Sequence, residues 1–254
     1  MEAENLASEI QEFRSFLAED LNGAITDEDC KRFLVARKHE IDKAVEMITE
    51  WWKWWHTPYP SCNGLTPANI LNVHNIVDPK VDIINRCAPH SFSGFGKNRN
   101  PIFWEKTGTI VSHLGELKDN FSLDELMAQH IRMQTVMNIR CQHISKMTGT
   151  PVEQVILVCD YKGMPMAPDF FAIEYTKRLF GIDQNYYPER LYRTYVINAP
   201  WFFTALYSLV SAWIDPNTAA KIRVLGSNYL STLREEIDDC DIPVEYGGSC
   251  EKFR

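Results

Sequence analysis

Residues with the chemistry for catalysis or metal binding occur in this sequence, but they do not form a recognised arrangement. Cys159 and Asp160 are adjacent, yet a thiol on a core strand with no histidine nearby in sequence is usually inert. The seven histidines are dispersed without metal-ligand spacing. His130 and His143 fall in a predicted helix, where packed or surface imidazoles are the simpler interpretation. Phosphate-binding loops, nucleophile elbows, H-E-x-x-H helices and G-x-G-x-x-G turns are missing from the sequence. The sequence therefore nominates no catalytic residue, no metal site and no cofactor.

The most distinctive segment is an uncharged run from Trp201 to Ile214. On a helix, Thr204, Ser208 and Ser211 form one thin polar stripe, and every other face is apolar or aromatic. Such a helix must be buried or must meet lipid on at least one side. At ~1.5 Å per residue it would reach about 21 Å, which is too short for a bilayer core of ~30 Å. We therefore expect a core helix or a lid rather than a membrane span.

The segments around this run predict the elements that position it. Tyr192–Asn198 is rich in β-forming residues, and Asp215–Asn217 is a turn. A short helix over Thr218–Lys221 and a strand over Ile222–Leu225 follow. Two parallel strands joined by a crossover helix belong to an α/β sheet, and such connections are right-handed.

The N-terminal region predicts short amphipathic helices that would form a cap on the main fold. Apolar residues at helical spacing predict a helix over Glu4–Leu21, ended by Asn22-Gly23. Thr26 is a good N-cap for a helix over Asp27–Lys38, which has acidic residues in its first turn. A third amphipathic helix follows over Ile41–His56.

Beyond a linker over Pro58–Pro67, the chain alternates predicted strands and helices, which indicates an α/β fold. Val155–Asp160 is an apolar run typical of a central parallel strand. Leu123–Met147 is a long helix that begins at a capping box of Ser122 and Glu125. The other expected strands are Val81–Cys87 and Pro101–Lys106, with a polar turn over Gly94–Asn100, and the other expected helices are Ala68–Val73, Asp169–Phe180 and Tyr229–Ile237.

The segment Trp51–Trp55 contains four tryptophans around one lysine and has two interpretations. The first is helix packing with a partly exposed aromatic rim. The second is an anchor at a membrane interface, because indole prefers the headgroup region. Consecutive tryptophans cannot all face one core, so we expect some of them to be partly exposed.

The bulk composition limits the classes of function. A chain of 254 residues is long enough for a substantial core. The net charge of −8 argues against non-specific binding to nucleic acid. The sequence contains no apolar run of membrane-spanning length, and its acidic N-terminus is unlike a signal peptide. The seven scattered cysteines are most simply interpreted as free thiols in a reducing compartment, so we expect a cytosolic protein.

Several motifs in one order resemble the CRAL-TRIO lipid-binding family, in its phosphatidylinositol/phosphatidylcholine transfer protein branch. Arg32-Phe-Leu-Val-Ala-Arg-Lys38 resembles its N-terminal helical signature, and Asn100-Pro-Ile-Phe-Trp-Glu105 resembles its first-strand region. The C-terminal motifs are Asn185-Tyr-Tyr-Pro-Glu-Arg190, Tyr195-Val-Ile-Asn-Ala-Pro-Trp201, Ile214-Asp-Pro216, Lys221-Ile-Arg-Val-Leu-Gly-Ser227 and Pro243-Val-Glu-Tyr-Gly-Gly248.

The resemblance implies an α/β fold with an N-terminal helical cap over residues 1–60 and a lipid-binding domain over 68–250. Its mixed, mostly parallel sheet would be flanked by helices and would hold a hydrophobic lipid pocket closed by a gate helix. The uncharged segment would be that gate, with Trp201, Phe202, Phe203, Leu206, Leu209, Val210 and Trp213 as its apolar residues.

The resemblance also implies a non-enzymatic lipid carrier with a headgroup site. Arg37 and Lys221 would pair with the phosphate of phosphatidylinositol, and Thr218 lies near Lys221 in the sequence. Glu189 would accept from inositol hydroxyls or orient Lys221. The alternative is that Glu189 with Lys221, or Arg37 at its helix end, forms only a structural ion pair or dipole contact.

This chain departs from the members that bind phosphatidylcholine. Their serine and threonine on the central strand correspond to Val155 and Leu157, and their tyrosines correspond to Phe92 and Phe103. Loss of these hydroxyls would leave a buried phosphate unsatisfied. A further arginine of many members corresponds to Val35, so the N-terminal basic patch is weaker.

We therefore expect a protein that keeps phosphatidylinositol and has lost phosphatidylcholine, with a sterol or another mostly apolar lipid as its second ligand. It would touch membranes transiently, bind no nucleic acid and present phosphatidylinositol to lipid kinases. The alternative is a lipid-loaded scaffold or sensor whose exposed tryptophans and acidic face bind a protein partner.

Overall fold

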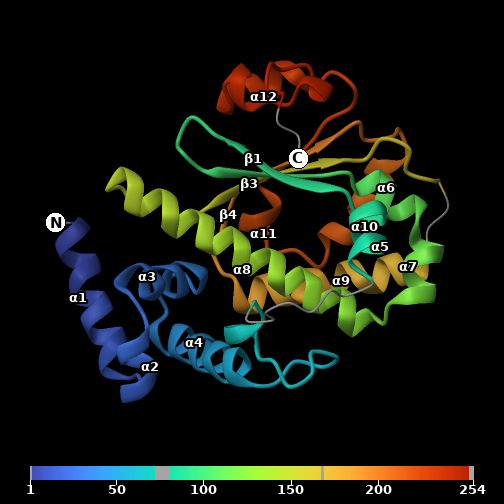
Figure 1. Cartoon of the computed structure of the whole chain (residues 1–254). Helices are drawn as coiled ribbons and strands as arrows, with labels where there is room; N and C mark the ends of the chain where they lie inside the picture. The colour runs from blue at the N-terminus through green and yellow to red at the C-terminus, as the bar shows by residue number, and fades with distance from the viewer. Residues whose placement is uncertain (1, 72–79, 167–168, 252–254) are drawn as a thin grey trace. The chain divides into compact units, whose positions relative to one another are not determined.

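The computed structural model describes residues 2–71, 80–166 and 169–251 (Figure 1). The chain forms two compact units. The first comprises Met1–Ile70 and Gly181–Glu189, and the second comprises Leu71–Phe180 and Arg190–Arg254. The division into a cap over 1–60 and a lipid-binding domain over 68–250 stays a prediction.

The first unit is helical, and its main helices begin where the sequence predicted. α3 (Asp27–Ala36) starts after Thr26, whose hydroxyl accepts from the Asp29 amide at 3.1 Å while the Asp29 carboxylate accepts from the Thr26 amide. α4 (Ile41–His56) has the predicted bounds. The other elements are α1 (Glu2–Ser15), α2 (Glu19–Ala24) and a 3-10 turn, η1 (Pro67–Asn69). This turn stands where Ala68–Val73 was expected as a helix, and residues 72–73 lie outside the described ranges.

The predicted helix over Glu4–Leu21 is wrong, because the chain forms two helices there and Asn22-Gly23 lies inside the second. Ala18 is extended, with a ψ of 149°, so the chain changes direction between α1 and α2. The Arg14 guanidinium holds this arrangement by donating to the side-chain oxygen and the carbonyl of Asn22, at 2.7 and 3.1 Å. These non-local hydrogen bonds outweigh the continuous helical periodicity of the sequence.

The tryptophans of α4 pack on one another and on a neighbouring tyrosine. Trp51 stacks on Trp55 with ring centroids 5.5 Å apart. Trp54 stacks on Tyr186 at 4.0 Å with the ring planes 3° apart. All four tryptophans are half-buried. Packing therefore accounts for this cluster without a membrane contact.

The second unit contains a five-stranded mixed sheet in the order β1-β2-β3-β4-β5. The strands are β1 (His90–Phe95), β2 (Pro101–Glu105), β3 (Val155–Asp160), β4 (Leu191–Ile197) and β5 (Ile222–Val224). β1 and β2 are antiparallel and form a hairpin, whereas the other neighbours are parallel. This arrangement confirms the predicted mixed, mostly parallel sheet with β3 at its centre.

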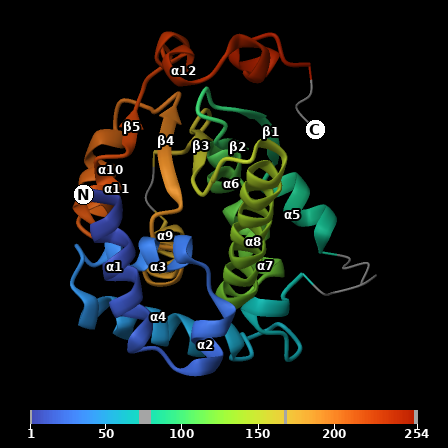
Figure 2. The ribbon, with the colours of Figure 1, turned by 90° about the vertical axis from the view of Figure 1, so that its left-hand side faces the viewer.

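Helices cover both faces of this sheet. Figure 2 shows α12 (Leu230–Glu236) on one side and α8 (Leu123–Thr148) on the other. α8 begins at the predicted capping box, in which the Ser122 amide donates to Glu125 at 2.8 Å. The remaining helices are α5 (Val81–Cys87), α6 (Thr107–Ser112), α7 (Leu114–Asn120), α9 (Phe170–Tyr186), α10 (Phe203–Ser211) and α11 (Pro216–Ala219), followed by the 3-10 turns η2 (Asp239–Asp241) and η3 (Val244–Tyr246). α9 begins in the second unit, and its end from Gly181 on belongs to the first.

Alternate side chains of each strand point to opposite faces of the sheet and pack into two different cores. On the α12 side, the sheet and the C-terminal turns share a core of Ile102, Trp104, Ile156, Val158, Tyr195, Ile197, Leu233, Ile237, Ile242 and Tyr246. On the α8 side, Phe103 and Val155 pack with Met137 and Ile144. The period of two along a strand produces this separation.

The segment Val81–Cys87 is the helix α5 rather than the predicted strand. Its residues Ile83, Ile84 and Cys87 pack on Leu117 of α7 at helical spacing. The strand that pairs with β2 is instead His90–Phe95, which includes Gly94 from the predicted turn. No helix within the described ranges is long and apolar enough to cross a bilayer.

Candidate functional site

One face of the sheet carries a row of apolar side chains from three neighbouring strands. Phe92 pairs with Phe103 and Phe103 with Leu157 in the strand register, so all three leave the same side of the sheet. The two phenylalanine rings lie 4.9 Å apart. Val155 follows the same alternation and is 6% exposed. These four residues, hereafter the apolar wall, are those for which the resemblance predicted a loss of hydroxyls.

The apolar wall packs against α8 and the loop that follows it. Its partners there are Met133, Met137, Cys141, Ile144 and Val152. Arg140 is exposed as a residue, but its guanidinium lies over the Phe92 ring at 4.7 Å from the centroid, and partial burial there lowers the pKa of the guanidinium. The structure thus brings the four predicted wall residues together and places one cation at the Phe92 end.

A second row on the same face is polar. His90 pairs with Glu105 and Glu105 with Cys159, one alternation further along the strands than the apolar wall. Burial raises the pKa of the Glu105 carboxyl, against the lowering influence of a hydrogen bond from Thr107 and of His90 and His130 nearby. Burial also raises the pKa of the Cys159 thiol, which agrees with the expected inert cysteine. We call His90, Glu105 and Cys159 the polar row.

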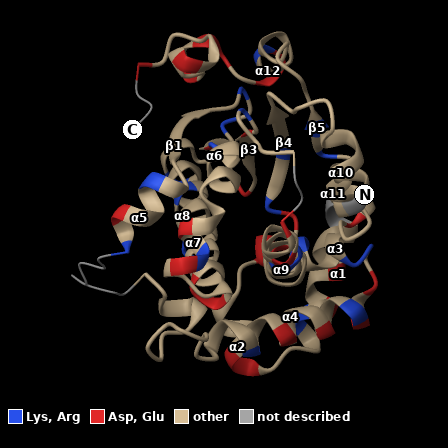
Figure 3. Ribbon diagram, turned by 90° about the vertical axis from the view of Figure 1, so that its right-hand side faces the viewer, with Lys and Arg blue, Asp and Glu red and all other residues tan. Residues whose placement is uncertain are grey.

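The uncharged helix is shorter than predicted. α10 spans Phe203–Ser211 instead of Trp201–Ile214, because turns with i to i+3 hydrogen bonds replace the helix at both ends. At its start the Phe203 amide donates to the Pro200 carbonyl at 2.9 Å, and at its end the Trp213 amide donates to Val210 at 3.0 Å. α10 contains no Lys, Arg, Asp or Glu, as Figure 3 shows.

The apolar residues of the uncharged segment differ in their surroundings. Phe203 is buried and its ring packs on Tyr161 at 4.7 Å, directly after β3. Trp201 is 84% exposed and precedes the helix, so it is not a helical residue as predicted. The half-buried residues are Phe202, Leu206, Val210 and Trp213. The side chain of Leu209 lies outside the described part of the structure.

Two of the predicted headgroup residues lie in the second unit. The Lys221 amide donates to the Thr218 carbonyl at 3.0 Å, and its own carbonyl accepts from the Thr194 amide at 3.0 Å. α11, capped by Asp215, thereby delivers Lys221 directly into β5. Both Lys221 and Thr218 are half-buried.

The other two lie in the first unit. Arg37 is the C-cap of α3, and its half-buried guanidinium donates to the Ala36 carbonyl at 3.2 Å. Glu189 is half-buried and has a φ of 56°, which is unusual for a residue other than glycine, asparagine or aspartate. A joint headgroup site of Arg37, Glu189, Lys221 and Thr218 stays a prediction.

Comparison with known proteins identifies the fold. The family model described as the CRAL/TRIO domain matches residues 85–248. The chain belongs to the CRAL/TRIO family. It is 30% identical to the SEC14 cytosolic factor of Candida glabrata, over 89% of this chain and 72% of that protein. It is 28% identical to the phosphatidylinositol/phosphatidylcholine transfer protein SFH12 of Arabidopsis thaliana, over 86% of this chain and 39% of that longer protein.

A solved structure supports the same assignment of the fold. The crystal structure of Sfh5 superposes with a TM-score of 0.67, covers 89% of this chain and 72% of that chain, and is 24% identical. These similarities confirm the predicted resemblance to the CRAL-TRIO family and to its phosphatidylinositol/phosphatidylcholine transfer branch.

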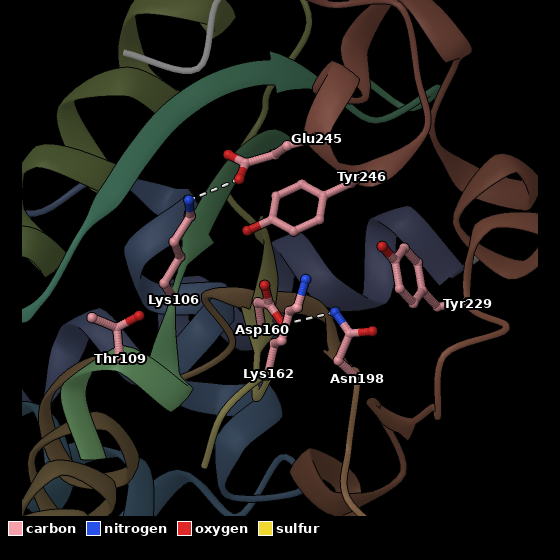
Figure 4. A pocket seen from close by; sticks show the side chains of 8 residues that line it. All are labelled: Lys106, Thr109, Asp160, Lys162, Asn198, Tyr229, Glu245 and Tyr246. Carbon is pink, nitrogen blue, oxygen red and sulfur yellow. Dashed lines mark hydrogen bonds and ion pairs between the residues drawn. The ribbon is translucent and has the colours of Figure 1, made fainter. Parts of the chain in front are cut away.

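The CRAL/TRIO domain also contains a polar pocket that the sequence analysis missed. It has a volume of about 250 Å³ and lies on the α12 side, where β2, β3 and β4 end (Figure 4). Lys106 forms an ion pair with Glu245 at 2.7 Å, and the side-chain amide of Asn198 donates to the Asp160 carboxylate at 2.8 Å. The full lining is Lys106, Thr109, Asp160, Lys162, Asn198, Tyr229, Glu245 and Tyr246.

A sequence signal for this pocket existed. Lys106, Asp160 and Asn198 stand at or just after the carboxyl ends of three parallel strands, where ligand sites of α/β sheets gather. Asp160 also accepts from the Lys162 amide at 2.9 Å, which fixes the loop after β3. Its carboxylate and that of Glu245 thus both have partners in this pocket, and the pocket carries no net charge.

Proposed function

We propose that this protein takes up phosphatidylinositol and transfers or presents it between membranes without catalysing a reaction. Its membership of the CRAL/TRIO family supports this proposal. A relative in Arabidopsis thaliana is named as a phosphatidylinositol/phosphatidylcholine transfer protein. The relative in Candida glabrata is named as a cytosolic factor, which supports a cytoplasmic location. Contact with membranes would then be transient.

A lipid carrier needs an apolar surface for acyl chains, and the apolar wall is the observation that carries the proposal. Transfer of one CH₂ group from water contributes ~0.8 kcal/mol, so long chains supply a large driving force. The wall presents Phe92, Phe103 and Leu157 in one unbroken row across three strands. α8 packs on this row, and Phe92 and Leu157 are only half-buried, so acyl chains could contact the part of the row that α8 leaves accessible.

The wall also supports a second ligand that is a sterol or another mostly apolar lipid rather than phosphatidylcholine. None of its four side chains carries a hydroxyl. A phosphate placed against them would lose its hydrogen bonds to water without replacement, and a buried unpaired charge is costly.

The headgroup of phosphatidylinositol would be bound by Arg37, Glu189, Lys221 and Thr218. The two cations would pair with the phosphate, and Glu189 would accept from inositol hydroxyls. α10 would act as the gate. Its lack of charge and its half-buried apolar side chains suit it to contact the lipid when shut and the bilayer when open.

Loading experiments test this function. The purified protein would be incubated with vesicles that contain mixed lipids, reisolated, and its bound lipids identified by mass spectrometry. We expect phosphatidylinositol and an apolar lipid. Abundant phosphatidylcholine would contradict the second-ligand proposal, and absence of phosphatidylinositol would contradict the carrier proposal. Supply of phosphatidylinositol to a lipid kinase would then be measured as product formed with and without the protein.

The alternative of a lipid-loaded scaffold rests on exposed tryptophans and an acidic face that would bind a protein partner. The four tryptophans of α4 are half-buried in stacking contacts, so this feature gives it little support. A tightly held lipid and a stable co-purifying protein would favour the scaffold, whereas fast exchange of lipid favours the carrier.

A further inference from the structure

The polar pocket lies on the face of the sheet opposite the apolar wall. On β3, Leu157 belongs to the wall and Asp160 lines the pocket, as the alternation of side chains along a strand requires. All the residues that line the pocket carry hydrogen-bonding side chains. An acyl chain placed there would deprive these side chains of their hydrogen bonds to water, so the pocket suits a hydrophilic ligand.

The size of the pocket limits that ligand to a small molecule. Its volume of about 250 Å³ equals the volume of about eight waters at ~30 Å³ each. A compound with a single ring and short substituents fits this volume, whereas a phospholipid or a peptide segment does not.

The backbone around the pocket is held in place by contacts within the protein. The Lys162 amide donates to the Asp160 carboxylate at 2.9 Å, and Asp160 is buried. α6 packs on the same loop so closely that a side-chain carbon at Gly108 would collide with the Lys162 carbonyl oxygen. Tyr246 is also buried and stacks on Trp104 with ring centroids 5.1 Å apart. Such a preformed site does not have to be ordered by its ligand.

Three lining side chains keep hydrogen-bonding capacity toward the pocket. Among the residues that the structure describes, the Thr109 hydroxyl and the Lys162 ammonium have no hydrogen-bond partner. Glu245 accepts from Lys106 at 2.7 Å, and a carboxylate has about four positions at which it can accept. Figure 4 shows Thr109, Lys162 and Glu245 around the same space, from α6, the loop after β3 and η3. The pocket therefore offers donors and acceptors together.

The charges of the lining disfavour an ionic ligand. Lys106 and Lys162 carry two positive charges, and Asp160 and Glu245 carry two negative charges. An anion in this small pocket would be attracted by both ammonium groups and repelled by both carboxylates, and the reverse holds for a cation. A hydroxyl group is uncharged and both donates and accepts. Several hydroxyl groups on one ring can therefore use the three available side chains at once.

We propose that this pocket binds a small uncharged ring compound with several hydroxyl groups, a free monosaccharide or cyclitol. Lys162 donates to one hydroxyl, Glu245 accepts from another, and Thr109 does either. The inference goes beyond the proposed function, because this ligand is water-soluble and its pocket lies across the sheet from the apolar wall.

An NMR titration of the isotope-labelled full chain with D-glucose and with myo-inositol tests the proposal. The signal to follow is the backbone amide of Lys162, which donates to Asp160 in the pocket. We expect a saturating shift with at least one of the two compounds and a Kd on the order of 1 mM, as for a small ligand without charge. Saturation distinguishes binding from the general effect of excluded solutes. Cyclohexanol, inorganic phosphate and glycine should give no saturating shift.

Two substitutions test the hydrogen bonds and the charge balance separately. Thr109→Val removes a hydroxyl but keeps the shape, and should weaken binding about tenfold, the order of one hydrogen bond. Thr150→Val, at an exposed position after α8, is the matched control and should bind as the wild type does. Glu245→Gln leaves the pocket with a net positive charge, so it should gain a saturating response to inorganic phosphate. Thermal unfolding checks that each variant is folded.

The outcomes are distinct from those for the lipid carrier. No saturating shift with either ring compound, or equal affinity in Thr109→Val and the wild type, would overturn the site. A saturating response of the wild type to inorganic phosphate, or none in Glu245→Gln, would overturn the argument from charge and with it the assignment of an uncharged ligand. Uptake of phosphatidylinositol from vesicles, measured on the same variants, should not change, because neither substitution lies on the apolar wall or among the proposed headgroup residues.

Discussion

Returning hydroxyl groups to the apolar wall should give the protein an uptake of phosphatidylcholine that we propose it lacks. Phe103→Tyr and Leu157→Thr are the substitutions of choice, because the two residues are register partners on one face. A hydrogen bond to a charged group contributes ~1.5–3 kcal/mol. Two such bonds to the lipid phosphate contribute about 3 kcal/mol at the lower end, which is on the order of a hundredfold in the binding constant.

The cost in stability does not prevent the test. Leu157 is half-buried, so its shortening to threonine should cost about 1–2 kcal/mol, within the ~5–15 kcal/mol that a folded domain has available. Phosphatidylcholine bound after incubation with vesicles would be measured by mass spectrometry. Leu157→Val is the matched control because valine has the shape of threonine without its hydroxyl. Equal phosphatidylcholine in the threonine and valine variants would refute the argument from missing hydroxyls.

Three further results are expected. Lys221→Ala should abolish phosphatidylinositol transfer between vesicles with no loss of fold, whereas Lys43→Ala, at an exposed position on α4, should not; unchanged transfer in the first would remove Lys221 from the headgroup site. Thr26→Ala should lower the free energy of unfolding in urea by ~1 kcal/mol through loss of the cap of α3, and Thr26→Ser should not; equal losses would contradict the capping role. A hydrogen bond from Lys80 lowers the pKa of Glu125 from its ordinary 4.5, so its stabilising effect is present above that pH and is lost as pH falls through the lower folded value. The difference in stability between wild type and Glu125→Gln should therefore shrink below about pH 4.5, and a constant difference would contradict it.

Local signals predicted the elements that depend on local physics. The bounds of β3 and α4 were read from an apolar run and from helical periodicity, and both match the structure. The start of α8 followed from the reciprocal hydrogen bonds of Ser122 and Glu125, which need only four consecutive residues. The signals for these bounds lie within a few residues of one another in the sequence.

The errors occurred where distant contacts decide the local structure. Val81–Cys87 has enough β-branched and apolar residues for a strand, but packing on α7 favours a helix. His90–Phe95 contains two serines and a glycine, and only its pairing with β2 makes it a strand. The break between α1 and α2 depends on Arg14, whose partners lie up to 13 residues away.

The sequence predicted which residues belong to the candidate site but not how they are arranged in the sheet. Resemblance pointed to Phe92, Phe103, Val155 and Leu157, whereas the rows they form depend on the register of strands far apart in sequence. Glu105 closes the motif that begins at Asn100 and Cys159 was noted beside Asp160, but nothing in the sequence placed the two residues next to each other. A register shifted by one residue would send both to the α12 side.

The alternation of side chains along β2 places Glu105 of the polar row where a carboxyl does not stabilise the fold. Trp104, its neighbour on β2, enters the core beneath α12 and stacks on Tyr246 at 5.1 Å. Glu105 must then face the α8 side, where burial raises its pKa and no lysine or arginine contributes to the shift. An apolar residue of similar size there would avoid that desolvation and fill the space equally well. The carboxyl of Glu105 therefore costs the fold stability at a position where an apolar side chain would not.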